Sequence, residues 1–241
     1  AWLESVGVDN SLTRVVADKY TASFFANTDL ANSQIASFYT GAMANAADLS
    51  MRDTAPNYPE LVVISPNDPG AMIKYAAECQ EMGLPYVYDP SQQVVRMRGE
   101  DLRAGTLGAF SLFLNEYEYE LLRKHTGLSE KDILGKVRFM VVTCGERGAT
   151  IYADDRKFNI SIAPPEKVVE PTGVGDAFRG GFLRGFRLGL DWQTCGQMGA
   201  LAATYCLEQR GTQNHSYTPA IFVARYRQYF DDQGALDALL R

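Results

Sequence analysis

The sequence predicts an α/β protein built on a doubly wound, mostly parallel sheet. Short continuous apolar runs, each the length of a buried strand, alternate along the chain with segments whose apolar residues recur at helical spacing. With 241 residues, the chain is long enough to bury a core without help from disulfides or metals. Its composition, 46% hydrophobic and 22% charged, is typical of a folded globular protein.

The N-terminal part of the chain predicts extended structure. Residues 20–28 are rich in Thr, Ser, Phe and Tyr, which favour strands over helices. After Pro56 the pattern changes to apolar runs that alternate with helices. We therefore predict a small β segment over about residues 15–45 and an α/β domain over residues 55–241.

The α/β domain is predicted to hold four buried strands and five helices. The strands cover residues 61–65, 84–88, 109–114 and 139–143. The helices cover residues 69–82, 116–125, 176–188, 192–209 and 219–229. Polar segments follow the four strands, at residues 65–68, 89–93, 115–118 and 143–148. Because ligands bind at the carboxyl ends of strands in open α/β sheets, we expect these segments to line one crevice.

Charge and residue counts exclude several classes of function. With 23 Lys and Arg against 29 Asp and Glu, the net charge of −6 disfavours nucleic acid or an anionic membrane as partner. None of the four cysteines forms a C-x-x-C pair, which predicts buried free thiols in a reducing compartment. His125 and His215 are too far apart in the sequence to suggest a zinc site or a Ser-His-Asp hydrolase. No signal peptide or membrane span is visible, so the expected location is cytoplasmic.

The motif that carries chemistry is Gly173-Val174-Gly175-Asp176, at the start of an apolar helix. Glycines allow a turn that directs several N–H groups to one point, and a helix N-terminus adds partial positive charge. Together they make an anion site suited to a transferring phosphoryl group, and Asp176 can accept the proton of an attacking hydroxyl. An ordinary Asp cap on a glycine-rich turn would give the same pattern, so the motif alone leaves both interpretations open.

The same helix carries Gly180, Gly181 and Gly185, which predict the close approach of another backbone. Two other phosphate motifs are absent from the sequence. Phe178 stands where a dinucleotide fingerprint needs its third glycine, and no Gly-Lys-Ser/Thr triplet of a Walker A loop occurs.

These motifs resemble those of the ribokinase-like (PfkB) family of carbohydrate and nucleoside kinases. Residues 172–178 match the anion-hole signature of that family. Its Asn-x-x-Glu element and its nucleotide-binding strand end are matched by Asn115, Glu118, Thr143, Gly145 and Gly148. Within the family, the bacterial-type adenosine kinases are the most similar, through a lid-like stretch and two further segments at residues 34–43, 89–93 and 211–213. The resemblance covers about residues 15–229.

The resemblance implies transfer of the γ-phosphate of ATP to the 5′-hydroxyl of adenosine, giving AMP. Asp176 would be the general base, and backbone N–H groups of Gly173, Val174, Gly175 and Asp176 would form the anion hole. Nucleotide contacts would come from Asn115, Thr143, Gly145 and Gly148, with Glu118 acting on Mg²⁺ through water. The substrate purine would lie between Phe24 and Phe38, with Gln92 and Gln93 nearby. Many members are also helped by a monovalent cation near the anion hole, so K⁺ is a second ion to test.

Structural explanations exist for the same residues. Phe24 and Phe38 would also suit packing within a lid, Gln92 and Gln93 a solvated loop, and Asn115 a helix cap. Two alternative functions therefore stay open: a sugar kinase of the same family, and a nucleotide-binding module without catalysis. Exposed lid strands also predict a homodimer formed through the lid.

The sequence departs from the family pattern in two places. Glu170 stands where many members carry Asp, and Val174 where many carry Ala, but neither change removes a backbone donor. Family members also begin with a strand, an early Asp and a Gly-Gly plus Asn segment, none of which precedes Trp2. We expect that N-terminal part of the fold to lie outside this sequence.

Overall fold

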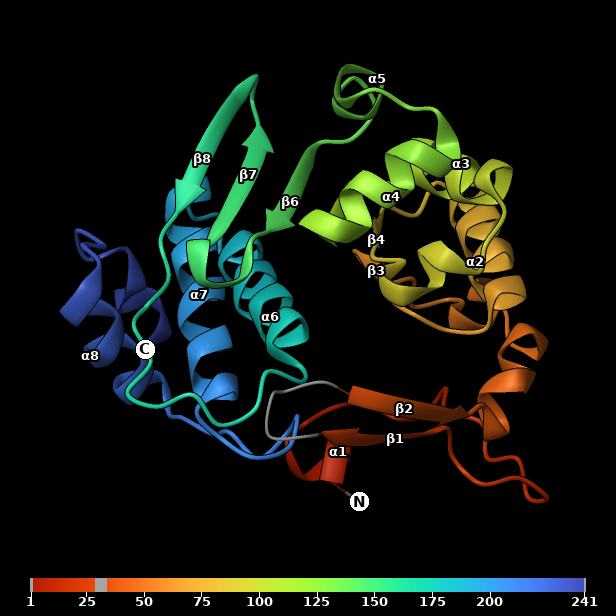
Figure 1. The fold of residues 1–241 in the computed structure, drawn as a ribbon, viewed down its shortest axis with the longest axis horizontal. Coiled ribbons are helices and arrows are strands. Elements are labelled where there is room, and N and C mark those ends of the chain that lie inside the picture. The colour runs from red at the N-terminus through yellow and green to blue at the C-terminus, as the bar shows by residue number, and fades with distance from the viewer. Residues whose placement is uncertain (1, 29–33, 241) are drawn as a thin grey trace. The chain divides into compact units, whose positions relative to one another are not determined.

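The computed structural model describes residues 2–28 and 34–240, which divide into two compact units at residues 1–109 and 110–241 (Figure 1). Residues 29–33, which belong to the predicted β segment, lie outside the described part. Both units combine helices with parallel strands, so the predicted α/β class is confirmed.

The first unit contains a two-stranded antiparallel sheet, named here the lid. Its strands are β1 (Ser23–Thr28) and β2 (Gln34–Tyr39), and Phe24 lies directly opposite Phe38. Short helical segments surround the lid in sequence, namely α1 (Trp2–Ser5), η1 (Gly41–Asp48) and η2 (Met51–Thr54). The extended structure predicted for residues 20–28 is therefore found from Ser23 onward.

The rest of the first unit is built on two parallel strands, β3 (Val62–Ile64) and β4 (Tyr86–Tyr88). Between them runs α2 (Pro69–Met82), which begins at an Asp68 cap and ends at Gly83 in the left-handed conformation. After β4 come η3 (Ser91–Val95) and α3 (Gly99–Gly108). Both strands and α2 were predicted, whereas α3 was not.

The second unit contains four neighbouring strands in the order β5-β6-β7-β8. Strands β5 (Ser111–Asn115) and β6 (Phe139–Thr143) pair in parallel, as predicted. Strands β7 (Ala149–Ala153) and β8 (Arg156–Ile160) continue the sheet in the antiparallel sense and were not predicted. They are joined by Asp154 and Asp155, which both have positive φ, as a tight two-residue hairpin requires.

Helices of the second unit follow the predicted positions closely. They are α4 (Glu116–Thr126), α5 (Glu130–Leu134), α6 (Val174–Arg187), α7 (Trp192–Leu207) and α8 (Pro219–Tyr229), followed by η5 (Ala235–Leu239). Neither α5 nor η5 was predicted, and α6 begins two residues earlier than expected. No helix in the described residues is long and apolar enough to cross a membrane.

An aromatic core and a glycine contact hold α6 in place. Phe182 packs against Phe113 and Phe139 of the sheet, with ring centroids 5.2 and 5.3 Å apart. A Cβ on Gly181 would lie 2.6 Å from the Met198 carbonyl oxygen of α7, so the predicted close approach is confirmed there. Gly180 faces open space, so the same expectation is wrong for that residue.

The four cysteines are free, as predicted. Cys79, Cys195 and Cys206 are buried, and Cys144 is half-buried. Burial raises the pKa of the Cys79 thiol to about 11, because the thiolate loses its hydration.

Candidate active site

The glycine motif forms an unusual entry into helix α6. Gly173 caps the helix with φ of +85°, a conformation that favours glycine. A Cβ there would also lie 3.0 Å from the Thr212 side chain. The turn therefore depends on glycine for both its backbone conformation and its packing.

Several N–H groups of this turn lack protein partners. The Val174 N–H donates to the Pro171 carbonyl at 3.3 Å, and the Ala177 N–H donates to the Gly173 carbonyl at 2.9 Å. Within the described residues, the N–H groups of Gly173, Gly175 and Asp176 have no hydrogen-bond partner. Because a helix N-terminus carries partial positive charge, these donors form a site for an anion.

Asp176 is the third residue of α6 and lies beside these donors. Its carboxylate reaches solvent and pairs with Arg179 one turn later, at 2.7 Å. Arg179 is mostly buried, with 12% of its side chain exposed. Neighbouring protein atoms displace part of the hydration of Asp176, which raises the pKa of its carboxyl. A carboxylate with a raised pKa is a stronger proton acceptor, which suits a general base.

The turn before α6 is braced by a distant loop. The Glu170 carboxylate accepts a hydrogen bond from the Gly211 N–H at 2.8 Å, and Thr212 packs on Gly173. Glu170 drew attention in the sequence only as a departure from a family pattern. Its bracing contact spans 41 residues, so no local sequence signal could have found it.

The carboxyl ends of β5 and β6 bring two predicted nucleotide-binding residues together. Asn115 and Thr143 are register partners on these parallel strands. The Asn115 side chain caps α4 by accepting the Glu118 N–H, and the Glu118 carboxylate accepts the Asn115 N–H, both at 2.8 Å. The structural explanation of Asn115 as a helix cap is thus confirmed.

The turn between β6 and β7 contains the two other predicted residues, Gly145 and Gly148, both with positive φ. At Gly148 a Cβ would lie 1.9 Å from the Ile160 carbonyl oxygen of β8, and its own carbonyl accepts the Cys144 N–H at 2.7 Å. Gly148 therefore has a structural role that is sufficient to explain it. Gly145 faces open space.

The residues predicted to bind the substrate all lie in the first unit. Phe24 and Phe38 are a cross-strand pair on one face of the lid, with 56% and 46% of their surfaces exposed. After β4, Ser91 has φ of +42°, and its hydroxyl donates to the Gln92 amide oxygen at 2.8 Å. Gln92 is exposed, as a loop residue would be.

Gln93 differs from its neighbour because it is buried, with 4% of its surface exposed. Its amide nitrogen donates to the Asn67 carbonyl at 2.8 Å, which joins the segments that follow β3 and β4. Its amide oxygen has no partner in the described residues. The alternative of a solvated loop is therefore wrong for Gln93.

Comparison with known proteins decides the family. The PfkB family of carbohydrate kinases matches residues 1–219 of the chain. The chain belongs to this family. PfkB enzymes are phosphotransferases that act on an alcohol group, and the glycine turn at the start of α6 is consistent with that chemistry.

Among the PfkB relatives is a nucleoside kinase of Methanocaldococcus jannaschii. It is 30% identical over 215 residues, which cover 89% of this chain and 70% of that protein. A nucleoside kinase of Methanothermobacter thermautotrophicus is 31% identical over 218 residues, covering 88% of this chain and 69% of its own.

Solved PfkB structures are similar over nearly the whole chain. The nucleoside kinase of Burkholderia thailandensis in complex with inosine has a TM-score of 0.90 and 33% identity, covering 95% of this chain and 76% of that one. The M. jannaschii nucleoside kinase has a TM-score of 0.87 and 29% identity, with 95% and 75% covered. These likenesses confirm the ribokinase-like fold.

Proposed function

We propose that this chain is an ATP-dependent nucleoside kinase that phosphorylates the 5′-hydroxyl of adenosine to give AMP. The observation that carries the proposal is the start of α6, where three unpartnered N–H groups lie beside the Asp176 carboxylate. Support for a nucleoside acceptor comes from the two archaeal nucleoside kinases and from the Burkholderia structures, whose ligands are inosine and ADP.

The proposed step is an in-line phosphoryl transfer. Asp176 takes the proton from the attacking hydroxyl, whose oxygen forms a bond to the γ-phosphorus while the bond to the β-phosphate oxygen breaks. Negative charge grows on the transferred group, and the N–H groups of Gly173, Gly175 and Asp176 stabilise it. The carbonyl of Pro171 competes for the Val174 N–H, so we expect Val174 to contribute less than the other three.

The ATP phosphates are proposed to lie along the carboxyl ends of β5 and β6. Asn115 and Thr143 face the same edge as register partners, and the turn at Gly145 leaves space for a ligand. When bound, Mg²⁺ neutralises phosphate charge. The oxygen donors of Asn115 and Glu118 fit this hard cation, and among the described residues no trio of His, Cys, Asp or Glu forms a complete metal site. K⁺ near the turn at residues 173–176 is proposed as an additional activator.

Purine recognition is proposed for the lid pair. Two phenyl rings directly opposite on an antiparallel sheet have Cβ atoms about 5 Å apart, and both rings are exposed. An exposed aromatic pair gains from burial against a flat base. A sugar acceptor would offer no such surface.

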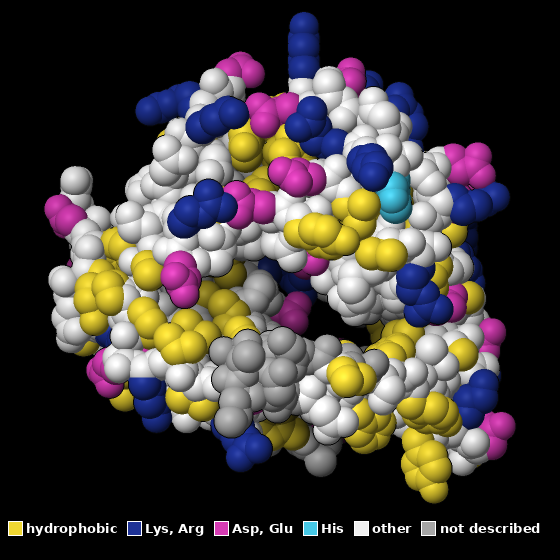
Figure 2. All heavy atoms as spheres, in the orientation of Figure 1, with side chains coloured by type: hydrophobic (Ala, Val, Ile, Leu, Met, Phe, Trp, Pro, Cys, Tyr) yellow, Lys and Arg dark blue, Asp and Glu magenta, His cyan; other side chains and the backbone are white. Residues whose placement is uncertain are grey.

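The opposite face of the lid supports the proposal of a homodimer. Phe25, Ile35 and Tyr39 share that face and are 63%, 81% and 46% exposed, and hydrophobic side chains gather over β1 and β2 in Figure 2. A two-stranded sheet with apolar side chains on both faces is marginally stable in water, and a second copy would cover the face that carries Phe25, Ile35 and Tyr39. The molar mass of the wild type and of Phe25→Ser in solution tests this, with a dimer expected only for the wild type.

The experiment that tests the function is ADP release from Mg-ATP by the full-length protein. Adenosine, inosine, cytidine, ribose and fructose are offered separately, with Asp176→Asn as control. Adenosine-dependent turnover that Asp176→Asn abolishes supports the proposal. Turnover with ribose or fructose and none with a nucleoside would show a sugar kinase instead.

A further inference from the structure

The lid is joined to the rest of the first unit by the segment that follows β2, residues 40–54, named here the lid stem. The chain entering the lid is tied to the same stem. The Ala42 N–H donates to the Tyr20 carbonyl at 2.9 Å, and a Cβ on Gly41 would meet that oxygen at 2.2 Å. Lys19 also donates to the Asn45 side chain at 2.7 Å. Both ends of the lid therefore meet at the stem.

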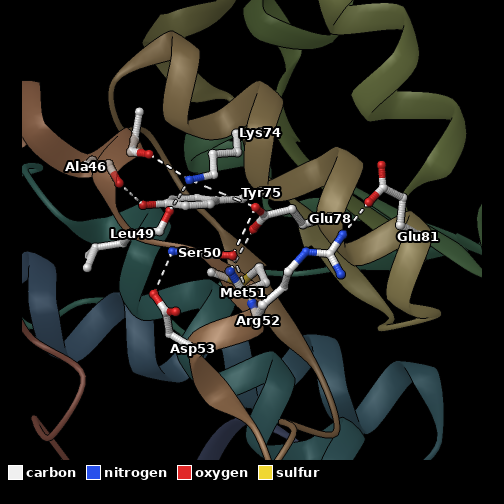
Figure 3. A network of polar contacts seen from close by, with 11 residues as sticks. Ala46, Leu49, Ser50, Met51, Arg52, Asp53, Lys74, Tyr75, Glu78 and Glu81 are labelled. Atoms are coloured by element: carbon white, nitrogen blue, oxygen red, sulfur yellow. Dashed lines mark hydrogen bonds and ion pairs between the residues drawn. The ribbon is translucent and has the colours of Figure 1, made fainter.

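The stem is held in turn by one face of α2 (Figure 3). The Glu78 carboxylate accepts the Ser50 hydroxyl at 3.0 Å through one oxygen and the Met51 N–H at 2.7 Å through the other. One turn earlier, the Lys74 ammonium donates to the carbonyls of Ala47 and Leu49 at 2.8 and 2.7 Å. The Glu78 side chain is 12% exposed and that of Lys74 35%, so the bonds to Glu78 are the better shielded from water.

Most of these contacts reach the backbone of the stem rather than its side chains. The Tyr75 hydroxyl also donates to a stem carbonyl, that of Ala46. A carboxylate and an ammonium that hold opposite backbone groups fix both the position and the direction of the segment. Charge-assisted bonds in a partly buried setting are stronger than neutral ones, so Glu78 and Lys74 dominate the anchorage.

In the sequence, helix α2 also lies between the segments that follow β3 and β4. The second of these segments carries Gln92 and Gln93, which are predicted to lie near the substrate. The helix follows Asn67 and Asp68 after β3 and precedes β4, whose end leads to Gln93. Gln93 binds the Asn67 carbonyl directly. Helix α2 therefore connects the lid stem with the two segments that follow β3 and β4.

We propose that Glu78 is a positioning residue for nucleoside binding, because it holds the lid stem on α2 and so fixes where the lid presents Phe24 and Phe38. The proposal rests on the proposed nucleoside kinase function. It assigns no contact between Glu78 and a substrate. Its signature is a raised KM for the nucleoside with little change in the KM for ATP or in kcat.

The test compares Glu78→Ala, Glu78→Gln and Lys74→Met with the control Glu81→Ala in the full-length protein. Glu81 lies three residues further along α2 and pairs with Arg52 at 2.5 Å, but both side chains are more than half exposed. Exposed pairs contribute little, so Glu81→Ala should behave as the wild type. Nucleoside KM, ATP KM and kcat are measured together with amide hydrogen exchange.

Supporting results are faster exchange over residues 40–54 and a several-fold rise in nucleoside KM for both Glu78→Ala and Lys74→Met. The exchange change should be about tenfold to a hundredfold, the factor expected when bonds to a charged group are lost. Exchange over residues 110–240 should not change. Glu78→Gln, which keeps one acceptor oxygen, should lie between Glu78→Ala and the wild type.

Two results would overturn the proposal. One is faster exchange in the stem with an unchanged nucleoside KM, and the other is exchange that rises equally throughout the chain, as for general loss of stability. If the wild type phosphorylates no nucleoside, the proposed function fails first and independently. Exchange in the lid strands then decides whether Glu78 anchors the lid: unchanged lid exchange in Glu78→Ala refutes the anchor, and faster lid exchange supports it.

Discussion

Asn115 and Thr143 lie opposite each other at the carboxyl ends of β5 and β6, and the Asn115 side chain is also the cap of α4. One side chain thus has a structural role and a proposed ligand role. A substitution of Asn115 changes both helix stability and the proposed binding of ATP. The same reciprocal cap occurs at the start of α5, away from the proposed site, so a substitution there measures the effect on stability alone.

Asn115→Ala should lower the free energy of unfolding by about 1 kcal/mol and also raise the KM for ATP. Ser129→Ala is the matched control, because Ser129 and Asp132 form the same reciprocal cap at the start of α5. It should lose similar stability with an unchanged KM for ATP. Denaturant unfolding and steady-state kinetics measure the two effects. If the KM for ATP is the same in both variants, Asn115 does not bind the nucleotide.

Phe24→Ala and Phe38→Ala should each raise the KM for adenosine several-fold, with stability nearly unchanged, because both rings are already exposed. Tyr58→Ala replaces another exposed aromatic residue of the first unit, outside the lid, and should leave the KM unchanged. Kinetics with adenosine provide the measurement. A wild-type KM in both Phe variants would show that the lid pair does not bind the base.

Gly180→Ala and Gly181→Ala should have opposite effects on stability. Gly180 faces open space on α6, so an Ala there should stabilise the helix by about 0.5–1 kcal/mol. At Gly181 the new methyl group would meet backbone of α7, and a cost of about 1–3 kcal/mol is expected. Thermal unfolding of both variants measures the difference, and equal melting temperatures would contradict the tight contact.

Gly148→Ala should be among the most damaging small substitutions in the second unit. It combines φ of +89° with a Cβ 1.9 Å from the Ile160 carbonyl oxygen, so we expect a loss of about 3 kcal/mol. Gly145→Ala, at φ of +57° with open space around it, should cost only about 1 kcal/mol. Urea unfolding compares the two. A small loss of stability in Gly148→Ala would mean that β8 moves easily away from the turn.

Asp232 should contribute to the pH dependence of stability. Its hydrogen bonds with Arg227, at 2.9 Å, lower the pKa of the carboxyl to about 2. Since the pKa in the native state is lower than in the unfolded state, the stabilisation is present above about pH 4 and is lost as the pH falls through 2. We expect about 1–2 kcal/mol, because Arg227 is 40% exposed.

Asp232→Asn should therefore be less stable than the wild type at pH 6, and the difference should shrink towards pH 2. Asp231→Asn, at the exposed neighbouring position, should follow the wild-type curve. Urea unfolding between pH 2 and pH 6 measures both variants. Parallel curves for Asp232→Asn and the wild type would refute the contribution of the ion pair.

Periodicity was enough to predict the strands β3 to β6 and the five main helices, because each contains a continuous apolar run or stripe, although in β3 only Ile64 is buried. The hairpin of β7 and β8 was missed. Strand β8 is mostly exposed, and the two-residue turn is Asp154-Asp155 rather than a glycine-containing pair. Helix α5 was missed because five residues are too few for a periodic pattern.

Site residues could be predicted where chemistry and local sequence coincide. Gly173 and Asp176 belong to one turn, so their relation is readable in the sequence. The brace between Glu170 and Gly211, and the bond from Gln93 to the Asn67 carbonyl, join distant segments. Such contacts depend on tertiary packing and leave no local pattern.

The brace between Glu170 and Gly211 also links ligand binding at the start of α6 to the stability of the second unit. Helices α6 and α7 lie between these residues in the sequence, so their contact closes a loop that contains both helices. We therefore expect the turn at residues 173–176 to lose its braced conformation when either helix detaches. A phosphate compound that binds the turn would select fully folded molecules and slow the loss of the whole second unit.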